Sequence, residues 1–248
     1  MSGHSKWSTI KRAKGAADQK RASLFTKLAR EITVAARTGL PDPEANARLR
    51  IAVQKARSEN MPKDNIQRAI DRASGGADGA NFDEITYEGY GPGGIALIID
   101  AMTDNRNRTV GEIRAAMTRS GGNLGESGSV GWMFDLVGII VVSTEGKDDD
   151  ELQMMAIEAG AIDVALDENV LEIYTEPTEL HAVASALGEL GLEPTTVELI
   201  KKPKTPMQPD TDTAIKVIRL IEKLEDLDDV QTVYSNLELS DDVMAQVS

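Results

Sequence analysis

The residues best suited to chemistry in this sequence are cations that stand close together near its beginning. Lys or Arg occupies positions 6, 11, 12, 14, 20 and 21, in a stretch with few apolar side chains. Burial of unpaired ammonium groups is prohibitively costly, so these side chains are expected to face water or phosphate. Trp7 lies among them, and an aromatic ring beside cations can stack on a nucleobase. The pattern suits nucleic-acid binding, but a solvated terminus, or a Trp7 that packs onto the following helices, fits it too.

Candidate nucleic-acid-binding residues extend from this run into the helix predicted after it. They are His4, Lys6, Trp7, Lys11, Arg12, Lys14, Lys20, Arg21, Lys27 and Arg30. Arg106 and Arg108 are secondary candidates, because they stand at the predicted start of a helix, where backbone N–H groups favour anions. The same two arginines could instead cap that helix and pair with Asp104. The sequence leaves both interpretations open.

Other kinds of site find little support. The sequence contains no Cys, which excludes disulfides, Cys-ligated metals and thiolate nucleophiles. His4 and His181 lie 177 positions apart, so neither a two-histidine metal site nor a Ser-His triad is indicated. The glycines of 87–94 lack the spacing of a dinucleotide-binding loop, and turn chemistry explains them. We therefore expect a protein that is not an enzyme, with no catalytic residue, cofactor, metal or small-molecule substrate.

The charges divide the chain into two unlike parts. The 248 residues carry 27 Lys and Arg against 41 Asp and Glu, a net charge of -14. Residues 1–75 hold 16 of the cations and 7 of the acids, so they balance at +9 and the remainder at -23. One part is expected to attract polyanions and the other to repel them, so overall acidity does not exclude nucleic acid. The acidic run 145–151 is expected to charge a helix N-terminus, or to dock a basic protein.

A membrane partner is not expected. The longest apolar runs are far shorter than the ~20 residues that cross a bilayer. No apolar signal-peptide segment follows the first residues. We therefore expect a cytoplasmic protein.

Three amphipathic helices are predicted in the basic part. Apolar residues recur every three or four positions in 23–37 and 43–58. A third helix is predicted to begin after Asn60, which is expected to be its N-cap, with Pro62 in its first turn. It is predicted to end at Gly75. The short connections favour a small helical bundle.

From residue 82 onward strands and helices are predicted to alternate. Strands are expected at 85–90, 95–102 and 130–134, with a helix at 106–119. Residues 138–200 then give the βαββαβ order of a ferredoxin-like domain. A helix at 213–224 and a strand at 230–235 supply the elements that the earlier unit lacks.

The predicted fold class is therefore α+β and multidomain. An N-terminal three-helix bundle is followed by two ferredoxin-like α/β domains, the third inserted in the second. The expected domains are 1–79, 82–133 plus 208–248, and 134–207. A continuous C-terminal tail packed elsewhere is the competing interpretation.

A series of ordered motifs resembles the YebC family. The motifs are Gly3–Trp7, Lys27–Ile32, Asn60–Pro62, Ile66–Ile70, Tyr87–Gly94, Asp104–Thr109 and Gly121–Gly125. That family includes bacterial regulators and the mitochondrial translational activator of cytochrome oxidase subunit I. The resemblance implies three domains and a non-enzymatic role linked to nucleic acid. Family members are described as DNA-binding transcriptional regulators, while others act on translating ribosomes, notably at proline-rich stretches.

We therefore expect a DNA-binding transcriptional regulator that uses its basic N-terminal domain. The alternative is a ribosome-associated translation factor that binds rRNA or tRNA and assists translation of proline-rich stretches. A third possibility is an interaction module that binds basic proteins through its acidic face. Because the acidic remainder would resist wrapping by duplex DNA, contact is expected to be confined to the basic N-terminal face.

Overall fold

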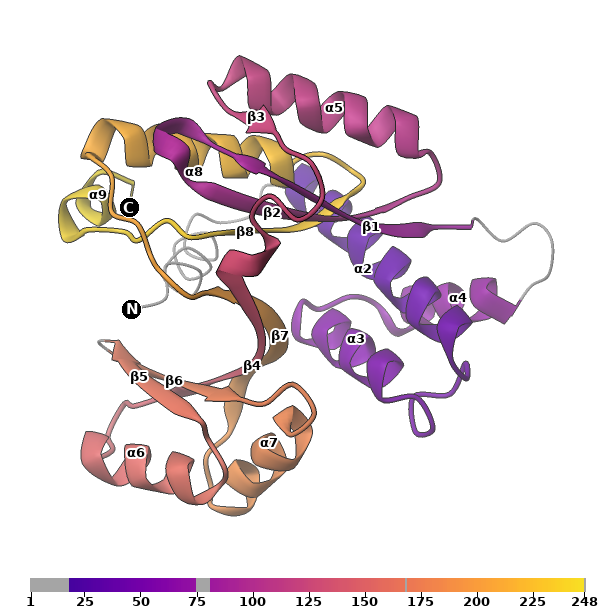
Figure 1. Ribbon diagram of the computed structural model, residues 1–248. Helices are drawn as coiled ribbons and strands as arrows, with labels where there is room; N and C mark the ends of the chain where they lie inside the picture. The colour runs from indigo at the N-terminus through magenta and orange to yellow at the C-terminus, as the bar shows by residue number, and fades with distance from the viewer. Residues whose placement is uncertain (1–17, 75–80, 168, 248) are drawn as a thin grey trace. The chain divides into compact units, whose positions relative to one another are not determined.

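The computed structural model describes residues 18–74, 81–167 and 169–247 (Figure 1). These residues form two compact units. The smaller unit is Met133–Thr205, and the larger combines the described residues before it with those from Pro206 onward. The class is mixed α+β, with two antiparallel sheets among the described residues.

Three helices form the first part of the larger unit. They are α2 (Asp18–Thr38), α3 (Ala47–Ser58) and α4 (Lys63–Ser74). Their apolar stripes meet in one core, which includes Leu28, Ile32, Leu49, Val53, Ile66 and Ile70. Asn46 starts α3, because its side-chain oxygen accepts a hydrogen bond from the Leu49 N–H at 3.1 Å. The three predicted helices are present, and α2 begins earlier than its periodicity indicated.

Asn60 ends one helix instead of beginning the next, so its predicted role as the N-cap of α4 is wrong. Its φ of 60° is left-handed, a conformation that commonly follows the last helical turn. The N–H groups of Asn60 and Met61 donate to the carbonyls of Arg57 and Ala56 at 3.0 and 2.9 Å. These bonds satisfy the last carbonyls of α3.

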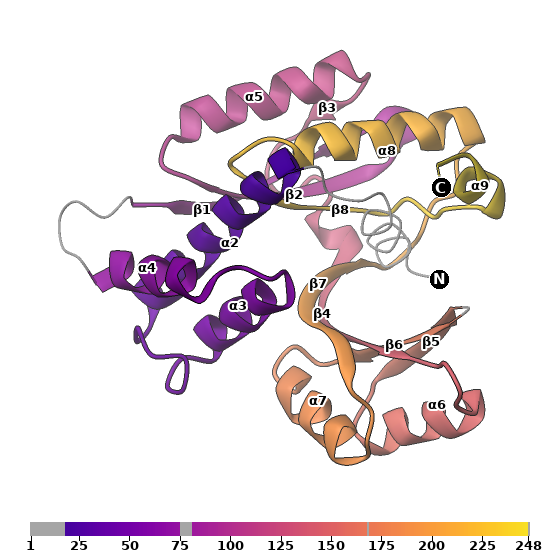
Figure 2. The ribbon, with the colours of Figure 1, turned by 180° about the vertical axis from the view of Figure 1, so that it is seen from behind.

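The rest of the larger unit is built on a four-stranded antiparallel sheet in the order β3-β1-β2-β8. The strands are β1 (Asp83–Tyr90), β2 (Ala96–Thr103), β3 (Asn123–Leu124) and β8 (Val230–Ser235). Helices α5 (Arg106–Arg119) and α8 (Thr211–Glu225) contact each other and lie on one side of this sheet, as Figures 1 and 2 show from opposite directions. A further helix, α9 (Asp241–Val247), was not predicted. Because β8 pairs with β2, the chain returns to its first sheet near the C-terminus.

The connections of this first sheet differ from the predicted ferredoxin-like order. A hairpin joins its two central strands directly, and both helices come later in the chain. The glycines that close the hairpin do so by conformation, since Gly93 and Gly94 have φ of 70° and 76°. The turn expected from the glycine-rich segment 87–94 is therefore confirmed.

The strand predicted at 130–134 is wrong. Gly131–Met133 forms a single 3-10 turn, η3, and β4 begins only at Phe134. The N–H groups of Gly128, Val130 and Gly131 donate to the Glu88 carboxylate at 2.7–2.8 Å instead of to a neighbouring strand. A carboxylate with three backbone donors fixes this segment as a loop.

The smaller unit has the βαββαβ order that the sequence predicts. Its sheet order is β5-β6-β4-β7, with all neighbours antiparallel. The strands are β4 (Phe134–Ser143), β5 (Asp163–Asp167), β6 (Val170–Thr175) and β7 (Pro194–Pro203). Helices α6 (Asp149–Glu158) and α7 (Leu180–Glu189) pack their apolar residues on one face of it (Figure 1).

Gly138 provides a test of how tightly this unit is packed. A Cβ at this position of β4 would lie 2.8 Å from Leu180 Cδ1 and 3.1 Å from Leu180 Cβ on α7. We expect Gly138→Ala to destabilise the protein by about 1–3 kcal/mol, because overpacking forces neighbours from their positions. The urea midpoint, followed by circular dichroism, measures this.

Gly188→Ala is the matched control, since Gly188 lies within α7 and a Cβ there meets no atom within 4 Å. It is expected to be stabilising by about 0.5–1 kcal/mol through helix propensity. Equal midpoints for the two variants would contradict this account of the packing.

Candidate nucleic-acid interface

The structure describes only part of the predicted nucleic-acid-binding set. His4, Lys6, Trp7, Lys11, Arg12 and Lys14 lie outside the described residues. The backbone at Lys20 belongs to α2, and Arg21 follows it with an exposed side chain. Lys27 and Arg30, further along the same helix, are partly buried.

Lys27 and Arg30 bind residues near the C-terminal end of α8. The Lys27 ammonium donates to the carbonyl oxygen of Glu225. The Arg30 guanidinium donates to the carbonyl oxygen of Asp228 at 2.5 Å and to the Asp229 carboxylate at 3.0 Å. Its guanidinium carbon also lies 5.3 Å from the centre of the Phe82 ring, a cation–π distance. Both cations therefore hold α2 against the α8–β8 connection.

Asp229 is the centre of this polar cluster, with a side chain only 3% exposed. One carboxylate oxygen, Oδ1, accepts from Arg30. The other, Oδ2, accepts from Arg108 Nη2 at 2.6 Å, Thr109 Oγ1 at 2.7 Å and Thr103 Oγ1 at 3.0 Å. The cluster therefore joins α2, the end of β2, the start of α5 and the residue before β8.

The pKa of Asp229 reflects a competition between burial and these donors. Burial alone raises the pKa, because it penalises the charged form. The hydrogen bonds from Arg108, Thr109 and Thr103, together with the charge of Arg30, outweigh burial and lower the pKa below its ordinary value of 3.8. Asp229 is therefore a buried carboxylate kept in its charged form by its neighbours.

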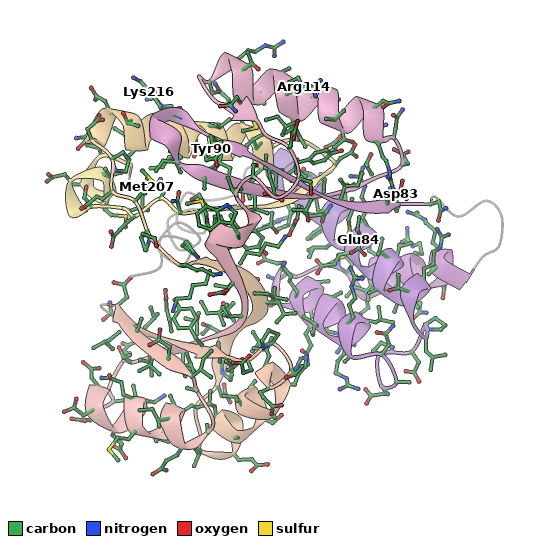
Figure 3. The ribbon with its side chains drawn as sticks, in the orientation of Figure 1. Asp83, Glu84, Tyr90, Arg114, Met207 and Lys216 are labelled. Atoms are coloured by element: carbon green, nitrogen blue, oxygen red, sulfur yellow. The ribbon has the colours of Figure 1, made fainter. Side chains whose placement is uncertain are left out.

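Arg106 and Arg108, the secondary candidates, are paired with carboxylates. Asn105 caps α5 by accepting from the Arg108 N–H at 3.1 Å. Arg108 also binds Asp104 at 2.7 Å, as one of the two sequence interpretations expected. Arg106 Nε lies 2.8 Å from Asp83 Oδ2 at the start of β1, where Figure 3 labels Asp83. The hydrogen bond and charge of Arg106 lower the pKa of Asp83, and both arginines are thus engaged by carboxylates within the fold.

Several other cations of the helical part are also engaged. Arg48 binds Glu84 at 2.6 Å, and Arg37 binds the Asn81 side chain at 2.7 Å. Arg50 donates to the carbonyls of Pro43 and Glu44. Within the described part of the chain, the exposed cations of these helices that have no ion pair are Arg21, Arg57, Lys63, Arg68 and Arg72.

Sequence reasoning missed both Asp229 and Glu88 as organising residues. Asp229 lies in the acidic stretch 225–229, where nothing distinguishes it from solvated neighbours. Glu88 occupies a strand position next to glycines and gives no pattern of its own. The only usable signal was the motif around Asp104–Thr109, whose Thr109 and Arg108 both contact Asp229.

Comparison with known proteins places the chain in a family. The profile described as the TACO1/YebC N-terminal domain matches residues 5–76, and that of the TACO1/YebC second and third domain matches residues 82–237. The chain belongs to the TACO1/YebC family. The resemblance drawn from the ordered motifs is thereby confirmed.

Relatives along almost the whole chain carry a regulatory name. A "Probable transcriptional regulatory protein" of Herpetosiphon aurantiacus is 55% identical over 244 residues, which cover 98% of this chain and 97% of the relative. A protein of the same name from Geotalea uraniireducens is 50% identical and covers 98% of each chain. A regulator is thus supported for this TACO1/YebC protein at the level of the family.

The fold is shared with a solved structure. The crystal structure of a conserved hypothetical protein from Aquifex aeolicus superposes with a TM-score of 0.83 at 47% identity, over 90% of this chain and 92% of the other. None of the described helices of this TACO1/YebC protein is both long and apolar enough to cross a membrane.

Replacement of Asp229 by Asn tests the polar cluster. The amide removes the charge and turns one oxygen into a donor that faces arginine and threonine donors. We expect a loss of about 3 kcal/mol in unfolding free energy, the scale for breaking a buried ion pair from one side. Urea denaturation measures it. The control is Asp228→Asn, because the Asp228 side chain is exposed, and an equal effect of both variants would contradict the proposed role.

The stability of the fold at acid pH should depend on Asp229. A folded-state pKa below 3.8 means that charged Asp229 stabilises the fold above that pH and that this contribution is lost as the pH falls further. We therefore expect the stability of the unaltered protein to fall steeply below about pH 4, and that of Asp229→Asn to fall less. Thermal midpoints measured across this range report the difference, and parallel curves would exclude Asp229 as a cause.

Proposed function

We propose that this protein is a non-enzymatic nucleic-acid-binding regulator, and that it contacts DNA through its basic N-terminal part to regulate transcription. The observation that carries the proposal is the concentration of positive charge there. Five exposed cations of the helical part, Arg21 among them, make no ion pair with a described residue, and the sequence places five more ahead of Arg21, at positions 6, 11, 12, 14 and 20. The regulatory name of the relatives supports the proposal.

Phosphate binding is the chemistry that such a surface supports. Each cation that neutralises a phosphate releases condensed counterions, and this release supplies the affinity. Exposed cations without a carboxylate partner can neutralise phosphates without breaking an ion pair within the protein. Arg30 is less suited, because its guanidinium already satisfies buried Asp229.

The run before α2 can be tested directly. We expect replacement of Lys6, Lys11, Arg12 and Lys14 by Ala to weaken binding of random-sequence duplex DNA. If each contacts one phosphate, the slope of log affinity against log salt becomes shallower by about 3.6, that is ~0.9 per contact. Fluorescence anisotropy over a series of salt concentrations measures both quantities.

The matched control removes four cations from the smaller unit, Lys147, Lys201, Lys202 and Lys204, and so changes the net charge equally. Circular dichroism verifies that both variants fold. Should the two sets weaken binding alike, the basic run would have no special role.

Crosslinking in cells identifies the polymer. Recovery of promoter DNA supports transcriptional regulation, whereas rRNA or tRNA would replace it with action on the ribosome. Recovery of proteins alone would overturn the nucleic-acid proposal in favour of an interaction module. The same crosslinking with the variant at Lys6, Lys11, Arg12 and Lys14 tests whether the recovered contact depends on the basic run.

A further inference from the structure

The acidic remainder of the larger unit has its positive charge on only two helices. Its segments 82–132 and 206–248 contain seven cations, which all lie on α5 or α8: Arg106, Arg108, Arg114, Arg119, Lys216, Arg219 and Lys223. The two helices carry only four acids, Glu112, Asp212, Glu222 and Glu225. The rest of these segments holds thirteen acids and no cation. The negative balance of the region therefore hides a locally positive helix layer.

The arrangement of α5 and α8 brings these cations onto one layer. The helices contact each other on the same side of the sheet, and Figure 3 labels Arg114 on α5 and Lys216 on α8. Lys223 reaches across from α8, with its ammonium 3.4 Å from the hydroxyl of Ser120 at the end of α5. Ile113 and Met117 on α5 and Val217 and Ile218 on α8 are buried, so each helix turns its apolar residues inward.

Three arginines of this layer are unengaged. Arg114, Arg119 and Arg219 are exposed and form no ion pair with any described residue. Arg106 and Arg108 are different, because they pair with Asp83, Asp104 and Asp229. Arg119 stands in the last turn of α5, where a cation also complements the helix dipole, but Arg114 and Arg219 stand in helix interiors. Because these three side chains are exposed and have no ion pair with a described residue, they are available to bind a ligand.

We propose that the outer surface of α5 and α8 is a second contact for the phosphate backbone of nucleic acid, with Arg114, Arg119 and Arg219 as its binding residues. The inference rests on the proposed function for the identity of the polymer. It departs from the expectation that contact is confined to the N-terminal face. Arginine suits the role because its planar guanidinium binds phosphate oxygens in pairs.

Local charge decides the attraction here, not the net charge of the chain. At about 0.1 M ionic strength, screening confines exposed charges to interactions within ~10 Å. Packed helices lie ~8–10 Å apart, so cations on neighbouring helices act together on a phosphate chain that passes over them. More distant acids contribute little.

The test is the triple variant Arg114→Gln, Arg119→Gln and Arg219→Gln in the full chain. On duplex DNA, three lost phosphate contacts make the salt slope shallower by ~2.7, so the fall in affinity between about 50 and about 200 mM salt shrinks by roughly 40-fold; on single-stranded RNA the slope becomes shallower by ~2.1. Binding is measured on random-sequence duplex DNA and on single-stranded RNA. A slope and affinity equal to those of the unaltered protein on both polymers would overturn the proposal.

A second variant separates local from overall charge. It adds Glu158→Gln, Glu189→Gln and Glu193→Gln, three exposed acids of the smaller unit, to the triple variant and so restores the net charge. Binding that stays weak supports a local contact surface on α5 and α8. Binding that recovers fully shows an effect of net charge and refutes the local surface.

Failure of this inference is distinguishable from failure of the proposed function. If substitution at Lys6, Lys11, Arg12 and Lys14 weakens binding while the triple variant binds normally, only the second surface is refuted. If the unaltered protein binds neither DNA nor RNA at any salt concentration, the proposed function fails, and the second surface fails with it. Urea midpoints of all variants identify any loss that comes from unfolding.

Discussion

One buried carboxylate links α2, β2, α5 and β8 of the larger unit. Removing a charge from water costs several kcal/mol, and only good geometry with further hydrogen bonds offsets that cost. Asp229 meets the condition with two arginines and two threonines drawn from α2, β2 and α5. Without a charged Asp229, Arg30 and Arg108 would both lose the buried anion that they share. The attachment of α2 to the α8–β8 connection therefore depends in part on the ionisation of this side chain, beside the contacts of Lys27 and Arg30 with the backbone.

The parts of this fold that were predictable from sequence are those that local patterns encode. The stripe of Leu28 and Ile32 on α2 and the βαββαβ order of 138–200 follow from residue periodicity, which acts within one element. The bonds of Asp229 join residues 121 and 199 positions away, and no short pattern specifies such distances. The strand expected at 130–134 failed for the same reason, because distant Glu88 binds the backbone donors that a strand would need.

The candidate site residues show the same difference between what local sequence patterns specify and what distant contacts decide. Residue type alone identified Lys27 and Arg30 as candidate nucleic-acid-binding cations, and the anion that Arg30 finds lies inside the fold. The grouping of Arg114 with Arg219 escaped notice because their positions are far apart in a region that sums to a negative charge. Only the packing of α5 against α8 brings the two segments into one layer. Net charge counted along a sequence therefore misses local fields that the tertiary structure creates.

The cations can be ranked as phosphate ligands by the free-energy cost of removing each one from its present partner. A phosphate that takes Arg30 must remove it from Asp229 and leave a buried carboxylate short of a partner, at a cost on the scale of ~3–5 kcal/mol. A phosphate that contacts Arg68 or Arg114 breaks no ion pair with a described residue. One exposed ion pair, however, contributes only ~0–1 kcal/mol. Affinity must then come from several exposed cations acting together through counterion release. Cations that are paired within the fold stabilise it, and exposed cations without a carboxylate partner are available to bind phosphate.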